Sequence, residues 1–344
     1  MSESKPPKLL DFEKPIFDMQ VKIEELEDLS RETGMNLNGG VRPLKDKLDQ
    51  LIDETFSNLT PWQRVALARH PGRPYTSDYV DWLMEDFVEL HGDRAFSDDP
   101  ALLCGLGKLG PHQVLLVGHR KGRDLKEKIA CNFGCAHPEG YKKALRKMKV
   151  AEKFGIPIVA LIDTPGAYPG IGAEERGQAF AIAENLMFMA GLRVPVVCVV
   201  IGEGGSGGAL GIGIGDRILM LEHSYYSVIS PEGCAAILWK TSEKAQQAAE
   251  ALRLTSWDLL ELGIVDDVIR EPRGGAHRLP EEMGERLSER LIAELDGLAG
   301  VPIDDLLDAR YEKFRQMGAL FADSLPDDEA PDEAATSVPS SAEQ

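Results

Sequence analysis

Two short apolar runs, each followed by a glycine-rich turn and a helical pattern, stand in succession near the middle of this chain. The first run, Ile156–Asp163, leads into the turn Thr164–Gly172, and the second, Val194–Ile201, leads into the turn Gly202–Gly208. Both runs are rich in β-branched residues and too short for a stable helix, which predicts two buried strands. The repeat of strand, turn and helix indicates an α/β fold.

Each turn brings its glycines to the start of a helical pattern, Ala173–Gly191 after the first and Gly207–Ile214 after the second. The first N–H groups of a helix lack intrahelical partners and lie at the positive end of its dipole. Because glycine has no Cβ, a substrate oxygen can approach those groups closely. Four glycines lie within Gly204–Gly208, which favours an oxyanion hole over a purely structural role in packing a helix on a strand.

The segments ahead of this repeat predict a helical hairpin followed by a further helix. Leu9–Leu59 carries two amphipathic patterns interrupted between Thr33 and Gly40, so we expect a hairpin that packs on its own core or serves as an arm for a partner subunit. Pro61–Pro74 is interpreted as a transitional segment. Tyr75–Leu90 has apolar residues at helical spacing and predicts a helix.

The remaining predicted elements alternate between strands and helices. Strands are expected at Leu102–Leu109, Val114–His119, Arg217–Leu221 and Gly263–Ile269. One helix is expected to end at Phe154, a second to begin with Ser230 as its N-cap, and a third to begin at Ser242. Three further helices are expected to span Ser256–Leu262, Leu279–Leu298 and Asp304–Phe321. Because two hairpin strands precede the first helix and the glycine turns recur at strand ends, we expect repeated ββα units rather than a simple doubly wound sheet.

The acidic composition bounds the partners and the domain organisation. The 344 residues carry a formal net charge of −19, which argues against general nucleic-acid binding. No Lys or Arg follows Arg315 while acidic residues accumulate, so we predict a disordered tail. We expect three parts: an N-terminal helical hairpin or arm at 1–60, a main domain with C-terminal helices at 61–321, and an acidic tail at 322–344. No signal-peptide core or membrane-length apolar run is found, which predicts a cytoplasmic protein that contacts no membrane.

The pattern C-x₃-C-x-H, formed by Cys131, Cys135 and His137, is a weak metal signal. Zinc sites generally need a fourth ligand at a recognisable spacing, so we interpret these residues as structural and expect no metal in this chain. A basic stretch follows from Arg120 to Lys149. It could contact an anionic substrate, such as the phosphates of coenzyme A, or an acidic partner, although a solvated helix face explains its second half equally well.

Gly204–Gly208 also matches the G-x-S-x-G nucleophile elbow of serine hydrolases, with Ser206 as the nucleophile. A triad would need an acid and a histidine later in the chain, and Asp266 or Asp267 with His277 is the only tolerable pair. His277 lies in a loop with no other catalytic character, which disfavours this alternative. A non-catalytic scaffold that keeps the same fold is a second alternative.

Three long runs, Ile162–Gln178, Val200–Gly211 and Ser227–Lys240, closely resemble the carboxyltransferase alpha subunit of bacterial acetyl-CoA carboxylase. Shorter stretches that are also similar to that family are Leu67–Pro71, Arg73–Thr76, Gly92–Arg94, Lys126–Ile129 and Gly274–Arg278. The resemblance covers roughly Phe12–Phe321, and ungapped runs of this length are highly specific.

The resemblance implies a crotonase-like fold and a half-reaction of fatty acid synthesis. In that half-reaction, the carboxyl group of carboxybiotin passes to acetyl-CoA to give malonyl-CoA, and the biotin is attached to the biotin carboxyl carrier protein rather than to this chain. The resemblance also implies a zinc-containing beta subunit as partner, an α₂β₂ assembly, and biotin carboxylase in the full complex. In this family the active site lies between the subunits, with the alpha side facing biotin and the beta side binding most of the coenzyme A.

By position, the resemblance assigns the oxyanion hole to the backbone N–H groups of Gly207 and Gly208, supported by Gly204 and Gly205. Glu203 is expected to orient this loop rather than to act as a catalytic acid. The other loop is expected to shape the biotin pocket through Gly166, Ala167, Tyr168, Pro169 and Gly170. The implied chemistry forms one oxyanion on biotin and one on the acetyl group, and backbone N–H groups stabilise both.

Overall fold

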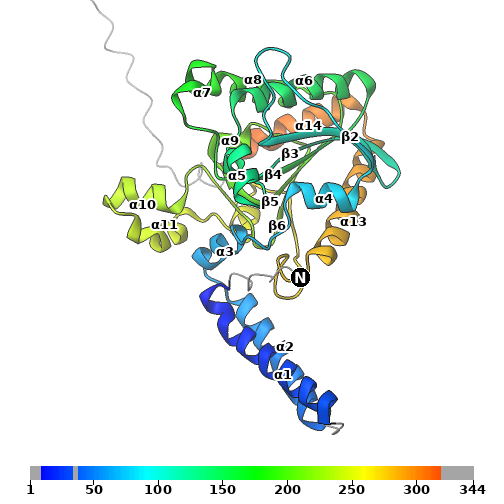
Figure 1. Cartoon of the computed structure of the whole chain (residues 1–344). Helices are drawn as coiled ribbons and strands as arrows, with labels where there is room; N and C mark the ends of the chain where they lie inside the picture. The colour runs from blue at the N-terminus through cyan, green and yellow to red at the C-terminus, as the bar shows by residue number, and fades with distance from the viewer. Residues whose placement is uncertain (1–8, 34–37, 319–344) are drawn as a thin grey trace, which may run out of the picture.

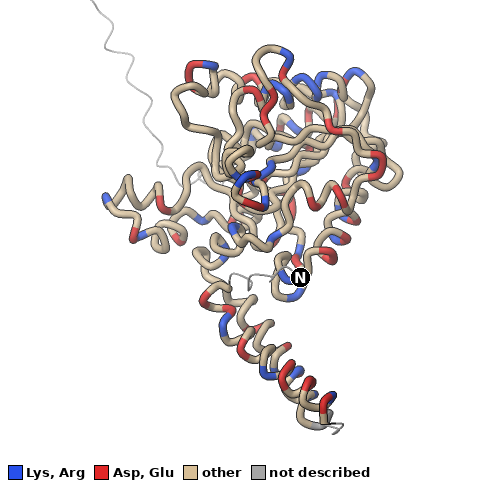
Figure 2. The backbone as a smooth tube through the Cα atoms, viewed as in Figure 1, with Lys and Arg blue, Asp and Glu red and all other residues tan. Residues whose placement is uncertain are grey.

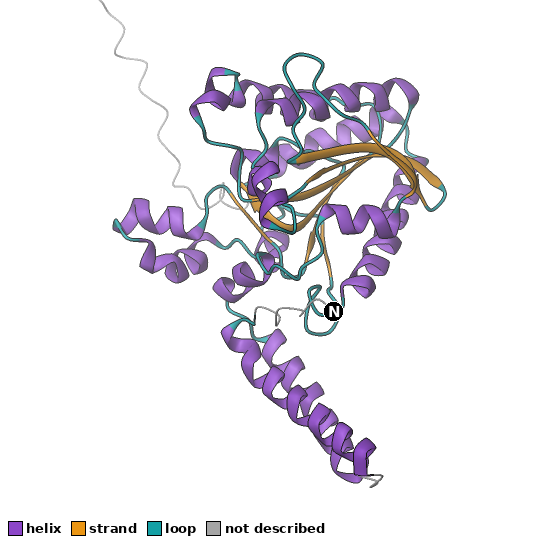
Figure 3. Cartoon of the chain, in the orientation of Figure 1, coloured by secondary structure: helices purple, strands orange, loops and turns teal. Residues whose placement is uncertain are grey.

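An eight-stranded sheet forms the centre of the computed structural model, which describes residues 9–33 and 38–318 (Figure 3). Its order is β1-β2-β3-β4-β5-β6-β8, and β7 pairs with β5 off this path. The strands are β1 (Glu85–Glu89), β2 (Leu102–Leu109), β3 (His112–His119), β4 (Ile158–Thr164), β5 (Val196–Gly205), β6 (Arg217–Leu221), β7 (Tyr225–Ser227) and β8 (Asp267–Ile269). The first three are antiparallel and the rest are parallel.

Helices cover both faces of the sheet, and each face has its own apolar core (Figure 1). One face carries α6 (Pro138–Phe154), α8 (Gln178–Ala190) and α14 (Ile303–Gln316). The other carries α4 (Thr76–Leu83) and α13 (Pro280–Ala299). Every residue of β4 and β5 is buried between these layers, which confirms the two buried strands predicted from the apolar runs.

The short helices lie mainly at the ends of strands. They are α3 (Pro61–Ala68), α5 (Leu125–Ala130), α7 (Ile171–Glu175), α9 (Ser206–Leu210), α10 (Pro231–Trp239), α11 (Ala245–Leu252) and α12 (Ser256–Glu261), with 3₁₀ turns at Asp11–Glu13, Asn132–Gly134 and Ser242–Lys244. The predicted cap of α10 is confirmed, because the Ser230 hydroxyl accepts a hydrogen bond from the Gly233 N–H. Helices α10 and α11 pack on each other at one side of the sheet domain (Figure 1).

The predicted N-terminal hairpin is confirmed as α1 (Lys14–Thr33) and α2 (Asn38–Ser57), which run away from the sheet domain (Figure 1). Lys, Arg, Asp and Glu alternate along its length (Figure 2). At its base, a small apolar core of Ile16, Phe56 and Leu67 joins the hairpin to α3. The break predicted between Thr33 and Gly40 and the tail at 322–344 fall wholly or partly outside the described residues.

The prediction of one helix over Tyr75–Leu90 is wrong. The helix ends at Leu83, and Glu85–Glu89 forms an edge strand that pairs antiparallel with β2. The Phe87 ring fills space left by a glycine of β2, because a Cβ on Gly105 would lie 2.2 Å from that ring. This segment therefore takes its structure from a long-range partner, although its apolar residues also have helical spacing.

Other boundaries also differ from the sequence prediction, and Ala173–Gly191, predicted as one helix, is divided between α7 and α8. Pro61–Pro74 contains α3, which begins at a capping box in which Gln63 and the Thr60 N-cap bond each other's backbone N–H groups. Gly202–Gly205, predicted as part of a turn, belongs to β5, because the strand continues along β7 and also contacts Thr164. No helix among the described residues is both long and apolar enough to cross a membrane.

Candidate active site at the carboxyl ends of β4 and β5

Two loops meet where the neighbouring parallel strands β4 and β5 end. Their backbones touch: a Cβ on Gly208 would lie 2.4 Å from backbone atoms of Gly166 and Ala167. A Cβ on Gly205 would lie 2.2 Å from the Pro165 carbonyl oxygen. Real Cβ atoms do not approach backbone so closely, so these glycines are required for the two predicted loops to be in direct contact.

The turn from β5 into α9 exposes backbone N–H groups. Ser206 has φ +54°, a left-handed conformation that non-glycine residues adopt rarely and mostly where the surrounding structure enforces it. The next residue has room for a Cβ, because a Cβ on Gly207 would meet nothing closer than Ile182 at 3.7 Å. The first N–H groups of α9 have no intrahelical partner, so this turn can offer donors to an oxygen from outside.

The Gly208 carbonyl oxygen is bound by a tyrosine of α6. The Tyr141 hydroxyl, from α6, donates a hydrogen bond of 3.2 Å to the Gly208 carbonyl oxygen. The Tyr141 ring is fully buried and packs so closely on Gly211 that a Cβ there would lie 2.5 Å away. Tyr141 therefore fixes the orientation of α9 against the sheet.

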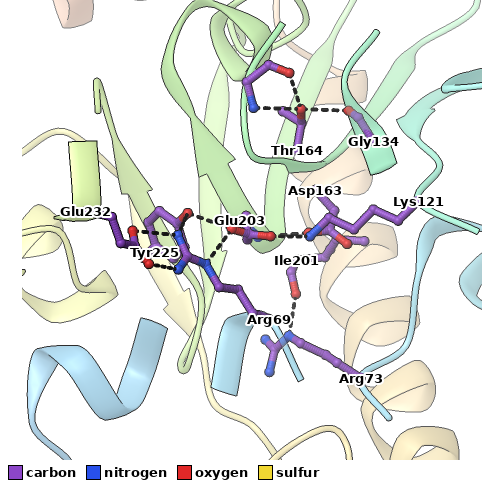
Figure 4. A network of polar contacts seen from close by, with 11 residues as sticks. Arg69, Arg73, Lys121, Gly134, Asp163, Thr164, Ile201, Glu203, Tyr225 and Glu232 are labelled. Carbon is purple, nitrogen blue, oxygen red and sulfur yellow. Dashed lines mark hydrogen bonds and ion pairs between the residues drawn. The ribbon is translucent and has the colours of Figure 1, made fainter. Parts of the chain in front are cut away.

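The loop after β4 is fixed by contacts on several sides. The Thr164 hydroxyl lies 2.7 Å from the Gly134 carbonyl oxygen and 2.8 Å from that of Gly166 (Figure 4). The Tyr168 ring lies against the His137 ring, with centroids 4.1 Å apart. The Gln178 amide donates a hydrogen bond of 3.1 Å to the Tyr168 carbonyl oxygen. These contacts pre-organise the loop that was expected to shape a ligand pocket.

Glu203, just before the glycines, is locked by cations and a hydroxyl (Figure 4). Its Oε1 lies 2.7 Å from the Lys121 ammonium, and its Oε2 accepts hydrogen bonds from Arg69 at 2.8 Å and from the Tyr225 hydroxyl at 2.7 Å. Burial alone would raise the pKa of Glu203, but Lys121 and Arg69 outweigh it and hold this pKa at about 2. The carboxylate stays ionised and fully bonded, which fits a role in orienting the loop.

The network extends beyond what the sequence indicated. Lys121 also lies 2.7 Å from Asp163, at the end of β4, and Arg69 reaches Glu232 of α10 at 2.5 Å (Figure 4). Sequence reasoning missed Arg69, Lys121, Asp163, Tyr225 and Glu232 as parts of this site. One signal was present, because Asp163 is a charged residue at the end of an otherwise apolar strand.

Much of the basic stretch between Arg120 and Lys149 has acidic partners inside the protein. Arg120 pairs with Glu89 at 3.0 Å, Arg123 pairs with Asp78, and Lys143 pairs with Asp98 at 2.6 Å. Together with Lys121, these cations already have partners in the fold. The expectation that the stretch serves an anionic ligand gains no support at these positions.

The residues proposed for a hydrolase triad do not contact one another. Asp266 accepts a hydrogen bond from the Ile218 N–H at 2.6 Å, and Asp267 pairs with Arg290 at 2.7 Å. His277 instead bonds Glu13 of the N-terminal segment at 2.8 Å and packs on His70. The predicted triad of Ser206, an Asp and His277 is therefore not assembled.

Within residues 9–33 and 38–318, the grouping with metal-ligand spacing is Glu13, His70 and His277, whose candidate atoms lie within 4.8 Å of one another. His70 Nδ1 accepts a hydrogen bond from the Gly72 N–H at 3.1 Å. In a neutral imidazole the proton must then be on Nε2, which leaves no free lone pair for a metal. The C-x₃-C-x-H residues form no such grouping in the described part of the chain.

Comparison with known proteins identifies similar sequences along nearly the whole described chain. Residues 9–318 match the family model described as acetyl co-enzyme A carboxylase carboxyltransferase-like. A protein named acetyl-coenzyme A carboxylase carboxyl transferase subunit alpha, from Xanthomonas campestris pv. campestris, is 58% identical over 313 residues, which cover 91% of this chain and 98% of that protein. A protein of the same name from Rhodopirellula baltica is 54% identical over 315 residues, which cover 92% and 98%.

Solved structures support the fold. Transcarboxylase 12S, with methylmalonyl-coenzyme A and methylmalonic acid bound, matches with a TM-score of 0.55 and 19% identity over 67% of this chain and 42% of that one. A Pseudomonas malonate decarboxylase hetero-tetramer in complex with coenzyme A matches with a TM-score of 0.52 and 17% identity, covering 66% of this chain and 92% of that one. The expected crotonase-like α/β fold is thereby confirmed.

Proposed function

Since this chain belongs to the family of acetyl-CoA carboxylase carboxyltransferase alpha subunits, we propose that its two glycine loops form the alpha side of the transferase active site. The protein is a carboxyltransferase subunit that acts in forming malonyl-CoA from acetyl-CoA. In our assignment, the backbone N–H groups of Gly207 and Gly208 form an oxyanion hole, and Gly204 and Gly205 allow the loop to pack there. The serine hydrolase alternative is not favoured, since Asp266, Asp267 and His277 have other partners and form no triad.

One observation carries this assignment: the turn into α9 offers backbone donors beside Gly207, where a Cβ would fit, while Glu203, just before the glycines, is already bound by Arg69 and Lys121. A site of this kind cannot exchange protons through Glu203, but it can stabilise negative charge on an oxygen. Donors fixed in advance favour a transition state in which such charge develops, because they need no reorganisation during the reaction.

Biotin would be held by the loop Gly166–Gly170 and by the free space beside Gly207. The residues fit such a group, because the loop is fixed by Gln178 and His137 and a Cβ on Gly207 would meet only Ile182 at 3.7 Å. When bound, carboxybiotin supplies the carboxyl group that is transferred. The part of this chain is to orient the reacting oxygens with N–H groups and to exclude water from the loop junction. We infer that the biotin is carried by the biotin carboxyl carrier protein.

The site on this chain is half of a composite one in our proposal. Large apolar side chains near the loops are exposed: Ile171 at 80% and Phe180 at 70%, and Val228 at 77%, which follows the strand residue paired with Gly205. Exposed apolar side chains of this size often mark a protein interface. We propose that the zinc-containing beta subunit covers these side chains in an α₂β₂ assembly. Biotin carboxylase completes the enzyme in this proposal. The complex is cytoplasmic and contacts neither membrane nor nucleic acid. No metal is assigned to this chain.

The experiment that tests the proposal uses the full chain, purified alone and co-purified with the beta subunit of the same source. Biotin-dependent decarboxylation of malonyl-CoA, the reverse half-reaction, is measured for both samples. We expect activity in the pair and none in the single chain, because each chain would contribute half of the site. A folded pair without activity, or two chains that do not associate, would contradict the proposal.

The scaffold alternative is tested in the same preparation. A matched pair that contains the Gly207→Val variant should associate as the wild type does and lose decarboxylation, because the added methyl groups occupy the space beside the N–H donors. If the variant pair keeps full activity, the oxyanion hole does not lie at Gly207.

A further inference from the structure

A buried lysine stands between the two acids from which the glycine loops begin. Lys121, which follows β3, lies 2.7 Å from Asp163 of β4 and 2.7 Å from Glu203 of β5 (Figure 4). These strands are consecutive neighbours in the sheet. Only 11% of the Lys121 side chain is exposed, and the two acids are buried more deeply. One ammonium group therefore joins the carboxyl ends of three adjacent strands.

The sides of the two acids that face each other are bonded within the protein. Asp163 Oδ1 accepts both the Lys121 ammonium and the backbone N–H of Glu203, the latter at 2.8 Å. Glu203 Oε1 is bound by Lys121, and Oε2 by Arg69 and Tyr225. The cluster thus links the strand ends, because the Lys121 ammonium binds one oxygen of each acid.

The charges alone would push the two loops apart. Two buried carboxylates repel strongly at short range in a medium of low dielectric constant, and Lys121 converts this repulsion into attraction. Burial would lower the pKa of Lys121, but Asp163 and Glu203 raise it above its usual value, so the ammonium stays charged. Burial raises the pKa of Asp163, which Lys121 only partly offsets.

The separation of the strand ends matters because the loops pack without side chains. Gly205 and Gly208 rest on the backbone of Pro165, Gly166 and Ala167, where even a Cβ would not fit. A small outward shift of either strand end would therefore move the N–H donors relative to the loop that faces them.

We propose that Lys121 is a positioning residue for the transfer reaction, which draws Asp163 and Glu203 together and so sets the distance between the two glycine loops. This inference rests on the proposed function of those loops. Lys121 touches neither substrate nor carrier in this role and acts only through the backbone that the two acids hold.

The main variant is Lys121→Met, which keeps the length of the side chain and removes its charge. In the co-purified pair we expect kcat for malonyl-CoA decarboxylation to fall about 100-fold, the effect of a misplacement of about 1 Å at a reacting centre. KM for malonyl-CoA should change less than about threefold, because the lost interaction acts on the transition state and not on coenzyme A binding.

Lys143→Met is the matched control. Lys143 is also a buried lysine and pairs with Asp98 at 2.6 Å, but it lies on α6 and holds neither loop. Both variants should lower the melting temperature, and only Lys121→Met should lower kcat. Equal kcat in the two variants would overturn the positioning role.

Two readouts separate positioning from a general loss of structure. Without Lys121, one of the two facing acids should bind a proton more readily, so kcat of Lys121→Met relative to wild type should rise at least about threefold from pH 8 to pH 6. Adding Glu203→Gln to Lys121→Met removes the repulsion and should restore part of the lost kcat. A pH-independent ratio with no gain in the double variant would overturn the inference.

Asp163→Asn is a second variant that tests the same inference if Lys121→Met does not fold. This variant weakens the same link without leaving an unpaired buried charge, and we expect about a tenfold lower kcat with unchanged KM. Wild-type kcat in this variant would overturn the inference. An inactive wild-type pair would overturn the proposed function, and with it any part of Lys121 in the reaction. An active wild type with unaffected variants would overturn the positioning role alone.

Discussion

The two ends of β5 carry buried ion clusters of similar composition and different consequence. At the amino end, the Val196 N–H donates a hydrogen bond of 2.7 Å to Asp216, and Arg310 binds both oxygens of this carboxylate at 2.8 Å. At the carboxyl end, Glu203 is bound by Lys121 and by Arg69 (Figure 4). Both clusters hold a charged group that burial would otherwise make costly.

The difference lies in what each cluster leaves open. Arg310 from α14 also donates to the carbonyl oxygens of Met189, Leu192 and Val194, so its donors are used up within the fold. The carboxyl-end cluster is followed by the turn into α9, where Gly207 has room for a Cβ and the first N–H groups of the helix have no intrahelical partner. A buried ion pair is therefore not by itself a sign of a functional site. The residues that follow it decide whether it only anchors a strand or also presents donors.

The largest effect is expected from a substitution that breaks the amino-end cluster. Arg310→Met leaves Asp216 buried without its cation, and we expect a loss of about 3–5 kcal/mol in the free energy of unfolding. Because this end is distant along the strand from the glycine turn, kcat of the folded fraction should stay within about twofold of wild type. Urea unfolding and the malonyl-CoA assay measure the two quantities.

Arg193→Met is the control for this prediction. Arg193 pairs with Asp304 at 2.9 Å, but both side chains are more than half exposed, so its loss should change the free energy of unfolding by less than about 1 kcal/mol. If the folded Arg310→Met variant had a much lower kcat, the amino end would be more than an anchor.

The next largest effect is a loss of kcat on substitution of a glycine at the carboxyl end, with a smaller loss of stability. We expect Gly207→Val to lower kcat about 100-fold or more, the cost of blocking one oxyanion donor, with less loss in melting temperature than at Gly208, because a Cβ on Gly207 would make only an ordinary contact with Ile182 at 3.7 Å. Gly297→Val, at a glycine of α13 where an added Cβ has no neighbour within 4 Å, is the matched control and should keep kcat. Gly208→Ala should lower both kcat and melting temperature, because its Cβ meets backbone.

The third effect is a change of about 1 kcal/mol in the free energy of unfolding with pH, which we assign to a histidine at the carboxyl end. His119 ends β3 beside this cluster, and burial, with a smaller effect of Lys121, lowers its pKa to about 3. A folded pKa below the unfolded value of about 6.5 means that the unfolded chain binds the proton first, so stability is lost as pH falls through 6.5 toward 3.

The measurement is the free energy of unfolding at pH 7 and pH 5.5 for wild type and His119→Gln. The variant should lose about 1 kcal/mol less between these values. The His119→Gln variant keeps part of the pH dependence of stability, because burial also lowers the pKa of His223 to about 4. The charge of Glu271 raises this pKa but does not outweigh burial. Glu203, with its pKa at about 2, adds a loss only below about pH 4.5. Equal slopes in the two proteins would show that His119 is not buried in the neutral form.

The smallest expected effect tests the serine within the glycine turn. Ser206→Gly removes the hydroxyl and relieves the left-handed conformation at φ +54°, so we expect kcat to fall less than about tenfold, in contrast to a hydrolase nucleophile, whose loss is far larger. Ser206→Ala serves as comparison, since it removes the same hydroxyl but keeps the strained conformation. A loss of more than about 1,000-fold in both variants would give the hydroxyl a direct part in the reaction.

The sequence predicted the central strands, the N-terminal hairpin and the family, because these depend on local periodicity and on long specific runs. It failed at β1, where Phe87 has helical spacing from Leu83 but packs on Gly105 of a neighbouring strand. It also ended β5 too early, because the pairing of Gly204 with Tyr226 is a long-range contact. The site residues themselves stay a prediction until the variants are measured.

The sequence by itself determined that two apolar strands end in glycine turns, since β-branched runs and glycine clusters act through local sterics. Only the tertiary structure decided that Lys121 ties these turns together and that Glu203 is saturated. Arg69 and Glu203 are 134 residues apart in the chain, and Lys121 and Glu203 are 82 apart. Such partners meet only after strand order and register are fixed, and no local pattern encodes which buried charges will then face each other.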